Sequence, residues 1–433
     1  MAISLTKRAI RKRSAAAAAV AAAAALALAA CSSSTGAGGA GTPNAKITLN
    51  IVGFEGGGTE LADIPQINAA FEKAHPNITI NYKYVSNTEY EAYNNTRLAA
   101  GTAADVLMVN HYYATTWVQQ GFLSDLSDQP WVSHVLPAVV PFGKFNNKTY
   151  AFIQQNIPIG LYANVDLLKQ AGINQVPTTW PDLLTDLQTL KAKGLGGLEI
   201  PNLQGWDAEQ VSLALAANLI DPNWGAKYDT GGTTWSGSWS PVIDRLKQLL
   251  TSGLVDGTTM NGIDPFTAGP AAFASGKYAF FVDGGWDLSH YKQTAPFNFT
   301  LNPFPGGDAG TTAKTFTFIG SGWSVNAASK QQAAAKEYVD FMTQPEQDSA
   351  YLAAESCFTT LDNVPSPQVP AAAPVAAAFA AGDTSPSQAE LIAYPDAENK
   401  FKPQLSSLFS NPSMSDSSLL SALDQQIPKT PAK

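Results

Sequence analysis

Cysteine is nearly absent from this chain of 433 residues, which contains only Cys31 and Cys357. If Cys31 carries a modification, as argued below, Cys357 has no partner and a disulfide framework is excluded. We expect Cys357 to be a small buried apolar residue. Arginine is also scarce after residue 30, where only Arg97 and Arg245 occur. This argues against a strongly anionic ligand, although lysines and helix N-termini could still bind one.

Motifs of catalysis and metal binding are lacking as well. The four histidines are scattered singly, at His75, His111, His134 and His290. No HExxH pair and no GxSxG nucleophile motif is present. The sequence therefore predicts no metal, no cofactor and no hydrolase of these kinds.

The first thirty residues are predicted to lie outside the fold. A basic stretch at residues 7–13 precedes an apolar run at 15–30, which is shorter than the ~20 residues of a membrane-spanning helix. The run ends Leu28-Ala29-Ala30-Cys31, which resembles the lipobox of bacterial lipoproteins. That resemblance implies a signal peptide at 1–30, a lipid on Cys31 and attachment to the outer face of the cell membrane. Uncharged residues 31–45 predict a flexible tether.

Removal of the leader makes the chain more acidic. The whole chain has a net charge of −9, from 26 basic and 35 acidic residues. Residues 1–30 contain five basic and no acidic residues, so the remaining 403 carry 21 minus 35, or −14. This charge argues against nucleic acid or anionic lipid as a partner.

Alternating strand and helix patterns predict an α/β fold, and the length suggests two domains. We expect strands at 47–52, 78–85, 105–109, 277–283, near 297–301 and at 315–325. Helices are expected around Ile64, Ile67 and Phe71, at 88–100, after the caps Thr179 and Ser240, at 329–343 and near 416–427. The Ala- and Pro-rich residues 370–388 are expected to be poorly ordered.

Five segments, in order, resemble the sugar-type (maltose-binding-protein-like) extracellular solute-binding proteins. They are residues 67–78, 160–180, 276–286, 320–325 and 341–346. The resemblance implies an α/β, two-lobe periplasmic-binding-protein type II fold with a hinge and an interlobe cleft. On that pattern lobe 1 comprises 46–152 with 281–322, and lobe 2 comprises 153–280 with 323–433. A monomer would deliver a carbohydrate from the cleft to ABC permease subunits.

Sugars offer apolar C–H faces and hydroxyl groups, so a site for them needs aromatic platforms and side chains that donate and accept hydrogen bonds. The resemblance places aromatic rings in the cleft at Trp286 and Trp323, and sugar contacts at Glu60 and Tyr162. Asn110 stands where the family often has Asp. Further candidates rest on their position in the sequence: Glu55, Tyr112, Gln155, Asn156, Trp206 and Gly322.

Each of these residues also has a purely structural interpretation. A tryptophan in such a segment can pack in the core, and Glu60 can stabilise a helix N-terminus. Three other functions also stay open. They are a glycan-active enzyme with two facing carboxylates, a binding protein for a polyamine, metal, phosphodiester or peptide, and a surface lipoprotein without a transporter.

Overall fold

The computed structural model describes residues 46–54, 63–386, 392, 394 and 396–429. Several sequence-based predictions fall outside this part: the leader, the tether, Cys31, Glu55 and Glu60. Within the described ranges, no helix combines the length and the apolarity needed to cross a membrane.

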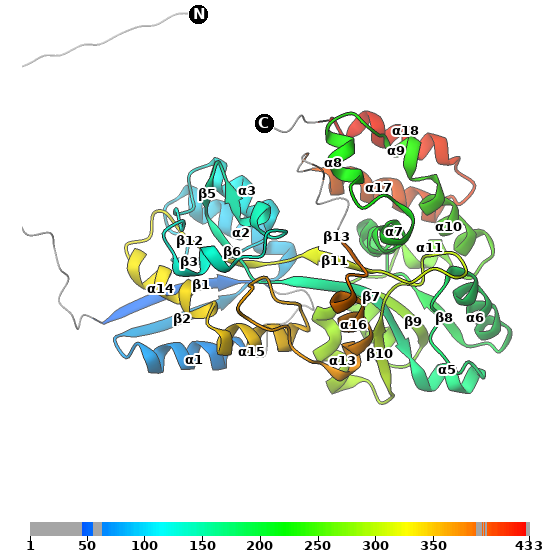
Figure 1. Ribbon diagram of the computed structural model, residues 1–433, viewed down its shortest axis with the longest axis horizontal. Helices are drawn as coiled ribbons and strands as arrows, with labels where there is room; N and C mark the ends of the chain where they lie inside the picture. Colours follow the sequence, from blue (N-terminus) through cyan, green and yellow to red (C-terminus); the bar gives the residue numbers. More distant parts are fainter. Residues whose placement is uncertain (1–45, 55–62, 387–391, 393, 395, 430–433) are drawn as a thin grey trace, which may run out of the picture. The chain divides into compact units, whose positions relative to one another are not determined.

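One five-stranded sheet has the order β2-β1-β3-β12-β6. Its strands are β1 (Ile47–Gly53), β2 (Ile78–Tyr84), β3 (Val106–Val109), β6 (Ala151–Ile153) and β12 (Gly322–Val325). Strand β1 pairs in parallel with β2 and β3, whereas β12 runs antiparallel between β3 and β6. Figure 1 shows β12 beside β3, although more than 200 residues separate them in sequence.

Helices of this first sheet come from both ends of the chain. They are α1 (Ile64–Ala74), α2 (Asn87–Ala99), α3 (His111–Gln119), α4 (Val140–Gly143), α14 (Gln332–Met342) and α15 (Pro345–Glu355). In α1, Ile67 and Phe71 lie four residues apart and are both buried, as the helical period predicts. The ring of Phe71 packs 5.2 Å from Tyr338 and 5.3 Å from Phe341 of α14. An early helix and a late one therefore share one core.

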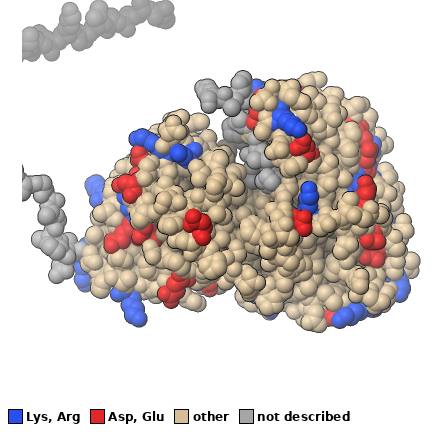
Figure 2. Space-filling view, viewed as in Figure 1, with Lys and Arg blue, Asp and Glu red and all other residues tan. Residues whose placement is uncertain are grey.

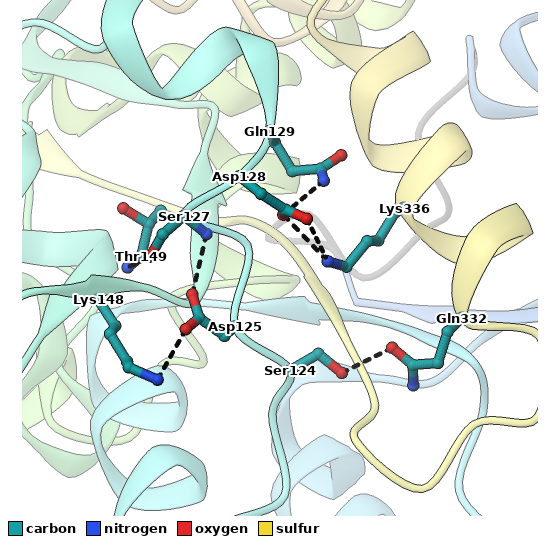
Figure 3. A network of polar contacts seen from close by, with 9 residues as sticks. All are labelled: Ser124, Asp125, Ser127, Asp128, Gln129, Lys148, Thr149, Gln332 and Lys336. Carbon is teal, nitrogen blue, oxygen red and sulfur yellow. Dashed lines mark hydrogen bonds and ion pairs between the residues drawn. The ribbon is translucent and has the colours of Figure 1, made fainter.

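A polar network fixes the loop at residues 124–129 to two neighbouring elements (Figure 3). Ser124 donates a hydrogen bond to Gln332 at the start of α14 (2.9 Å), and Asp128 pairs with Lys336 one turn later (3.0 Å). Asp125 accepts from the backbone of Ser127 and pairs with Lys148 of β5 (Lys148–Thr149). These contacts hold the pKa of Asp125 below its ordinary value.

A second sheet has the order β13-β11-β7-β9-β8, with β10 also paired to β7. Its strands are β7 (Asn156–Asn164), β8 (Gly196–Glu199), β9 (Tyr278–Gly284), β10 (Phe299–Asn302), β11 (Thr315–Ile319) and β13 (Thr384–Pro386). β7 is long enough to pair with β11 along one half and with β10 along the other. All nine of its residues are buried, since sheet neighbours and helices surround it.

The helices of this second part include α5 (Val165–Ala171), α6 (Trp180–Ala192), α7 (Trp206–Leu219), α8 (Trp224–Asp229), α9 (Trp235–Ser238), α10 (Ser240–Thr251), α11 (Gly257–Met260), α12 (Ala268–Ala274), α13 (Leu288–Thr294), α16 (Ala373–Ala381), α17 (Ala397–Ser410) and α18 (Asp416–Gln426). Short 3₁₀ turns occur at Pro130–His134, Leu203–Gly205, Gly285–Asp287 and Pro370–Ala372, and β4 (Lys144–Phe145) forms a hairpin with β5. A buried aromatic cluster of Trp224, Trp235, Trp239 and Phe401 fixes α17 against α8 and α9.

The chain passes between the two sheets three times. The first crossing is at Gln154-Gln155 and the second at Gly320-Ser321. The third is near Ser356, which lies between helix α15 of the first part and Phe358, a residue that forms a backbone bridge with Asn156 of β7. The backbone N–H groups of Gln154 and Gln155 both donate to the carbonyl of Ser321 (3.0 and 3.1 Å). Ser356 adopts φ 52°, a left-handed conformation that a serine rarely takes. These three crossings are therefore bonded to one another.

The pairing corrects two expectations about lobe boundaries. Residues 281–319 belong to the second sheet, because β9, β10 and β11 pair with β7. Residues 322–355 belong with the first sheet. Phe358 then bridges to β7, but residues 360–362 bond back to His134, Leu136 and Ile153 of the first part, and the second part continues with the 3₁₀ turn Pro370–Ala372. The expected strand at 315–325 is two strands in different sheets, because Gly320-Ser321 breaks it at a crossing.

Predictions about single helix caps, segments and residues had mixed outcomes. The Thr179 cap is confirmed, since its side chain accepts from the backbone N–H of Asp182. The Ser240 cap is wrong, because α10 begins at Ser240 itself and its capping residue is Trp239. The expectation of poor order is wrong for residues 370–386, which form a 3₁₀ turn, α16 and β13. Cys357 is buried, as predicted.

Candidate ligand-binding site

A cleft of about 680 Å³ lies where the segments of the two sheets meet. Its walls are formed by Phe54, Asn87, Asn110, Gln155, Ile157, Trp206, Gln210, Phe266, Trp286, Phe318, Gly320, Ser321 and Glu355. Five of these are aromatic, five are uncharged hydrogen-bonding side chains and one is a carboxyl group.

Strand ends supply the first-sheet wall. Phe54 directly follows β1 and packs against Tyr90, with ring centroids 4.6 Å apart. Asn110 follows β3 and caps α3, its side chain accepting from the backbone N–H of Tyr113 (2.9 Å). The cap uses one oxygen, and the amide NH₂ remains available to a ligand. Asn87 is the first residue of α2.

Helix α7 supplies two side chains of the opposite wall. Trp206 begins the helix after Gly205, which has φ 83°, and Gln210 follows one turn later. Residues four apart lie on one helix face, so both point into the cleft. Gln210 is 4% exposed, and its side-chain oxygen has no hydrogen-bond partner among the described residues. Phe266 packs 5.0 Å from Trp206, which extends the aromatic surface.

Trp286 lies in the turn after β9, at the end of the second sheet. Its ring folds back over Gly284, where an added Cβ would lie only 2.2 Å from a ring carbon. The glycine thus creates the space that the indole occupies. Behind the ring, Asp283 and Asp287 are almost fully buried. Burial and their mutual proximity raise the pKa of Asp283, and burial raises that of Asp287.

Gln155 joins the cleft to the crossings. Its side-chain oxygen accepts from both the N–H and the hydroxyl of Ser321 (2.9 Å each), and its NH₂ donates to Tyr351 and Glu355 (3.1 Å each). Burial raises the pKa of Glu355 to about 8, so this wall residue is largely protonated at neutral pH. Gln155, in the first crossing, is thus bonded to Ser321 of the second and to the neutral Glu355 beside the third.

The cleft brings together Asn110, Trp206 and Trp286 from the predicted set, together with the positional candidate Gln155. The other described candidates lie outside its walls. Trp323 is fully buried in β12, and its indole N–H donates to Gln154 (2.7 Å). The structure thus places this tryptophan in the core rather than on a ligand platform, because the strand between β3 and β6 turns its side chain inward.

Four further candidates lie outside the cleft walls and make contacts within the protein. Tyr162 is buried and donates to the carbonyl of Gly284 (2.8 Å). Gly322 lies within the sheet, where a Cβ would meet the carbonyl oxygen of Phe152 at 1.9 Å. Asn156 forms a backbone bridge with Phe358, and Tyr112 is 39% exposed and donates to Glu91 (3.2 Å).

Several wall residues were not predicted from the sequence. Two local features of the sequence could have indicated some of them. Gly320-Ser321 interrupts an apolar stretch, and Gln210 lies four residues after Trp206 on the same helix. Phe266, Phe318 and Glu355 carry no such signal, because tertiary folding alone brings them to the cleft. In the described ranges, no group of three His, Cys, Asp or Glu residues is placed to hold a metal ion.

Residues 56–349 match the family profile described as bacterial extracellular solute-binding protein. This match covers more than half of the chain, which therefore belongs to that family. A relative in Bacillus subtilis, the melibiose/raffinose/stachyose-binding protein MelE, is 26% identical over 340 residues, covering 74% of this chain and 76% of MelE. Binding proteins of Brucella abortus are 25% identical over 253 residues, and the match spans only 60% of their length.

Solved structures share the architecture. A chitin oligosaccharide binding protein superposes with a TM-score of 0.74 at 18% identity, covering 88% of this chain and 98% of the other. RafE of Streptococcus pneumoniae superposes with a TM-score of 0.68 at 20% identity, covering 89% and 98%. The fold is therefore the two-lobe α/β fold of solute-binding proteins, with the cleft between its lobes.

Proposed function

We propose that this protein captures a neutral sugar or oligosaccharide outside the cytoplasm and delivers it to the permease of an ABC importer. The observation that carries the proposal is the composition of the cleft. Aromatic rings suit the C–H faces of sugars, and Asn, Gln and Ser side chains suit their hydroxyl groups. Relatives named for melibiose, raffinose and stachyose binding support the same ligand class.

Charge supports a neutral ligand over its rivals. The cleft wall contains no Lys or Arg in the described ranges, so a phosphodiester would find no cationic partner there. A polyamine would favour several ionised carboxylates, but among the described wall residues Glu355 is the single carboxyl group, and burial keeps it largely protonated. A glycosidase needs two facing carboxyl groups, and the part of the wall that the structure describes contributes one, Glu355. On the face shown in Figure 2, charges of both signs are scattered without a large patch of one sign.

The proposal extends to anchoring and transport. A lipid on Cys31 would keep the protein at the membrane surface, and closure of the two lobes over the sugar would present a distinct shape to the permease. Replacement of Cys31 by Ser is expected to release the protein into the medium with its sugar affinity unchanged. A Cys31→Ser variant that stays with the membrane would contradict lipid anchoring.

Thermal unfolding of the lipid-free chain tests the ligand class. The panel contains melibiose, raffinose, stachyose, chitin oligosaccharides, spermidine, glycerophosphodiesters and short peptides. A sugar present at 100 times its Kd is expected to stabilise the fold by about 2.7 kcal/mol. The released sugar is then analysed by chromatography, since an unchanged ligand is expected. Stabilisation by spermidine or a phosphodiester but by no carbohydrate would overturn the proposal, and cleavage of the sugar would indicate an enzyme.

A further inference from the structure

A second cavity of about 890 Å³ adjoins the cleft and shares Asn87, Trp206 and Phe266 with it. Its other walls are Leu203, Gln204, Asp264, Pro265, Asn399, Lys402 and Pro403. The two cavities thus meet at the Trp206–Phe266 pair. We call the cleft the inner compartment and the adjoining cavity the outer compartment.

A tightly held turn shapes the boundary between them. Gln204 and Gly205 both have left-handed backbones, with φ 63° and 83°. A Cβ at Gly205 would lie 2.3 Å from the carbonyl oxygen of Lys402, so α17 leaves space there only for glycine. This turn exposes Leu203 to 39% on the outer side and starts α7 with Trp206 on the shared wall.

The outer compartment carries one ammonium group, but that charge is compensated. Lys402 lies over the ring of Trp206, 4.3 Å from its centroid, and pairs with Glu209 (3.2 Å) and Glu398 (3.1 Å). Its side chain is only 14% exposed, so it supports the indole more than it attracts an anion. The carboxylate of Asp264 accepts from the backbone N–H groups of Phe266 and Thr267 (2.9 Å each), and the amide of Asn399 donates to Asp396 (2.8 Å). With the amides of Asn87 and Gln204 and the apolar side chain of Leu203, these walls suit a neutral, hydroxyl-bearing molecule.

We infer that the ligand is an oligosaccharide that fills the inner compartment and continues past Trp206 and Phe266 into the outer compartment. This inference rests on the proposed function and adds the length of the ligand. The two compartments share a wall at Trp206 and Phe266, so a sugar chain that extends from the inner compartment past this wall reaches Leu203 and Asn399. A mono- or disaccharide would leave Leu203 and Asn399 in water.

The test is isothermal titration calorimetry with neutral oligosaccharide series of one to six units, using the linkage that binds in the thermal panel. Affinity is expected to rise at least about tenfold once the chain is long enough to enter the outer compartment. Leu203→Ala and Asn399→Ala are expected to weaken long ligands about three- to tenfold and to leave mono- and disaccharides unchanged. Tyr112→Ala is the matched control, because Tyr112 is equally exposed and lines neither compartment.

The outcomes separate this inference from the proposed function. Mono- or disaccharides that bind as tightly as longer chains, with no effect of Leu203→Ala on any length, would overturn the inference alone. Failure of every carbohydrate to bind would overturn both. Leu203→Trp, whose larger side chain enters the outer compartment, provides an independent check, since it should exclude long ligands selectively while the melting temperature without ligand stays unchanged.

Discussion

Substitution of Gly284 by alanine should remove ligand affinity by displacing a tryptophan, without touching the ligand itself. The backbone of Gly284 has φ −86° and ψ 168°, which alanine adopts freely, so conformational strain is not the reason. An added methyl group would instead lie 2.2, 2.3 and 2.5 Å from three carbons of the Trp286 ring. Those separations are far below van der Waals contact, and the ring must leave its position over the strand.

The magnitude follows from what the ring contributes. A buried aromatic anchor at the centre of a binding site is worth about 2–4 kcal/mol, so Gly284→Ala should weaken sugar binding about 30- to 1,000-fold. Overpacking of this kind costs about 1–3 kcal/mol of unfolding free energy, which leaves the protein folded. Calorimetry measures the first quantity and urea unfolding the second.

A double-mutant cycle tests whether Gly284→Ala weakens sugar binding through displacement of Trp286. Trp286→Ala alone should weaken binding to a similar extent, and adding Gly284→Ala to it should have almost no further effect, because the colliding ring is gone. If Gly284→Ala binds sugar as well as the unaltered protein, Trp286 is not a ligand platform. If the two effects add in full, the glycine acts through some other contact.

Three further predictions concern stability. Trp323→Ala should lower the free energy of unfolding by about 3–5 kcal/mol while sugar affinity stays within about threefold, and a selective loss of affinity would return Trp323 to the site. Gln155→Ala should cost about 2–5 kcal/mol, because four buried hydrogen bonds are lost. The control Gln129→Ala, at a half-buried position with one side-chain hydrogen bond, should cost under about 0.5 kcal/mol, and equal effects would refute a special role for the crossings. Burial raises the pKa of Glu199 from 4.5 to about 8, so between these values the folded chain keeps a proton that the unfolded chain has released. Stability should therefore fall as pH rises through this window, by at most about 1.4 kcal/mol per unit for this group, and Glu199→Gln should flatten that slope in urea unfolding at pH 5, 6, 7 and 8.

Sequence periodicity predicted elements well and their assembly less well. The strands at 47–53 and 78–84 and helix α1 follow from spacings of two and of three to four residues, which local geometry imposes. The lobe boundaries were misplaced because strand pairing is non-local. Between residues 315 and 325, only Gly320-Ser321 indicates in the sequence that the chain passes from one sheet to the other.

The candidate site was predictable only where a local feature marks it. Asn110 and Trp286 directly follow strands, and strand ends are where α/β folds place ligands. Trp323 resembles Trp286 in sequence, since a glycine precedes each, but the first lies inside a strand and the second after one. A shift of a few residues thus separates a core side chain from one that lines the cleft, and composition cannot resolve it.

The position of β12 has a consequence for biosynthesis. This strand joins β3 to β6, yet it emerges some 170 residues after β6 has been made. A nascent chain of 320 residues thus presents two unsatisfied strand edges, and such edges invite pairing with other chains. Premature termination before residue 325 should therefore yield insoluble material. Folding of the complete chain is slowed by this long-range pairing, which leaves an interval in which the unfolded polypeptide can still pass through a narrow pore.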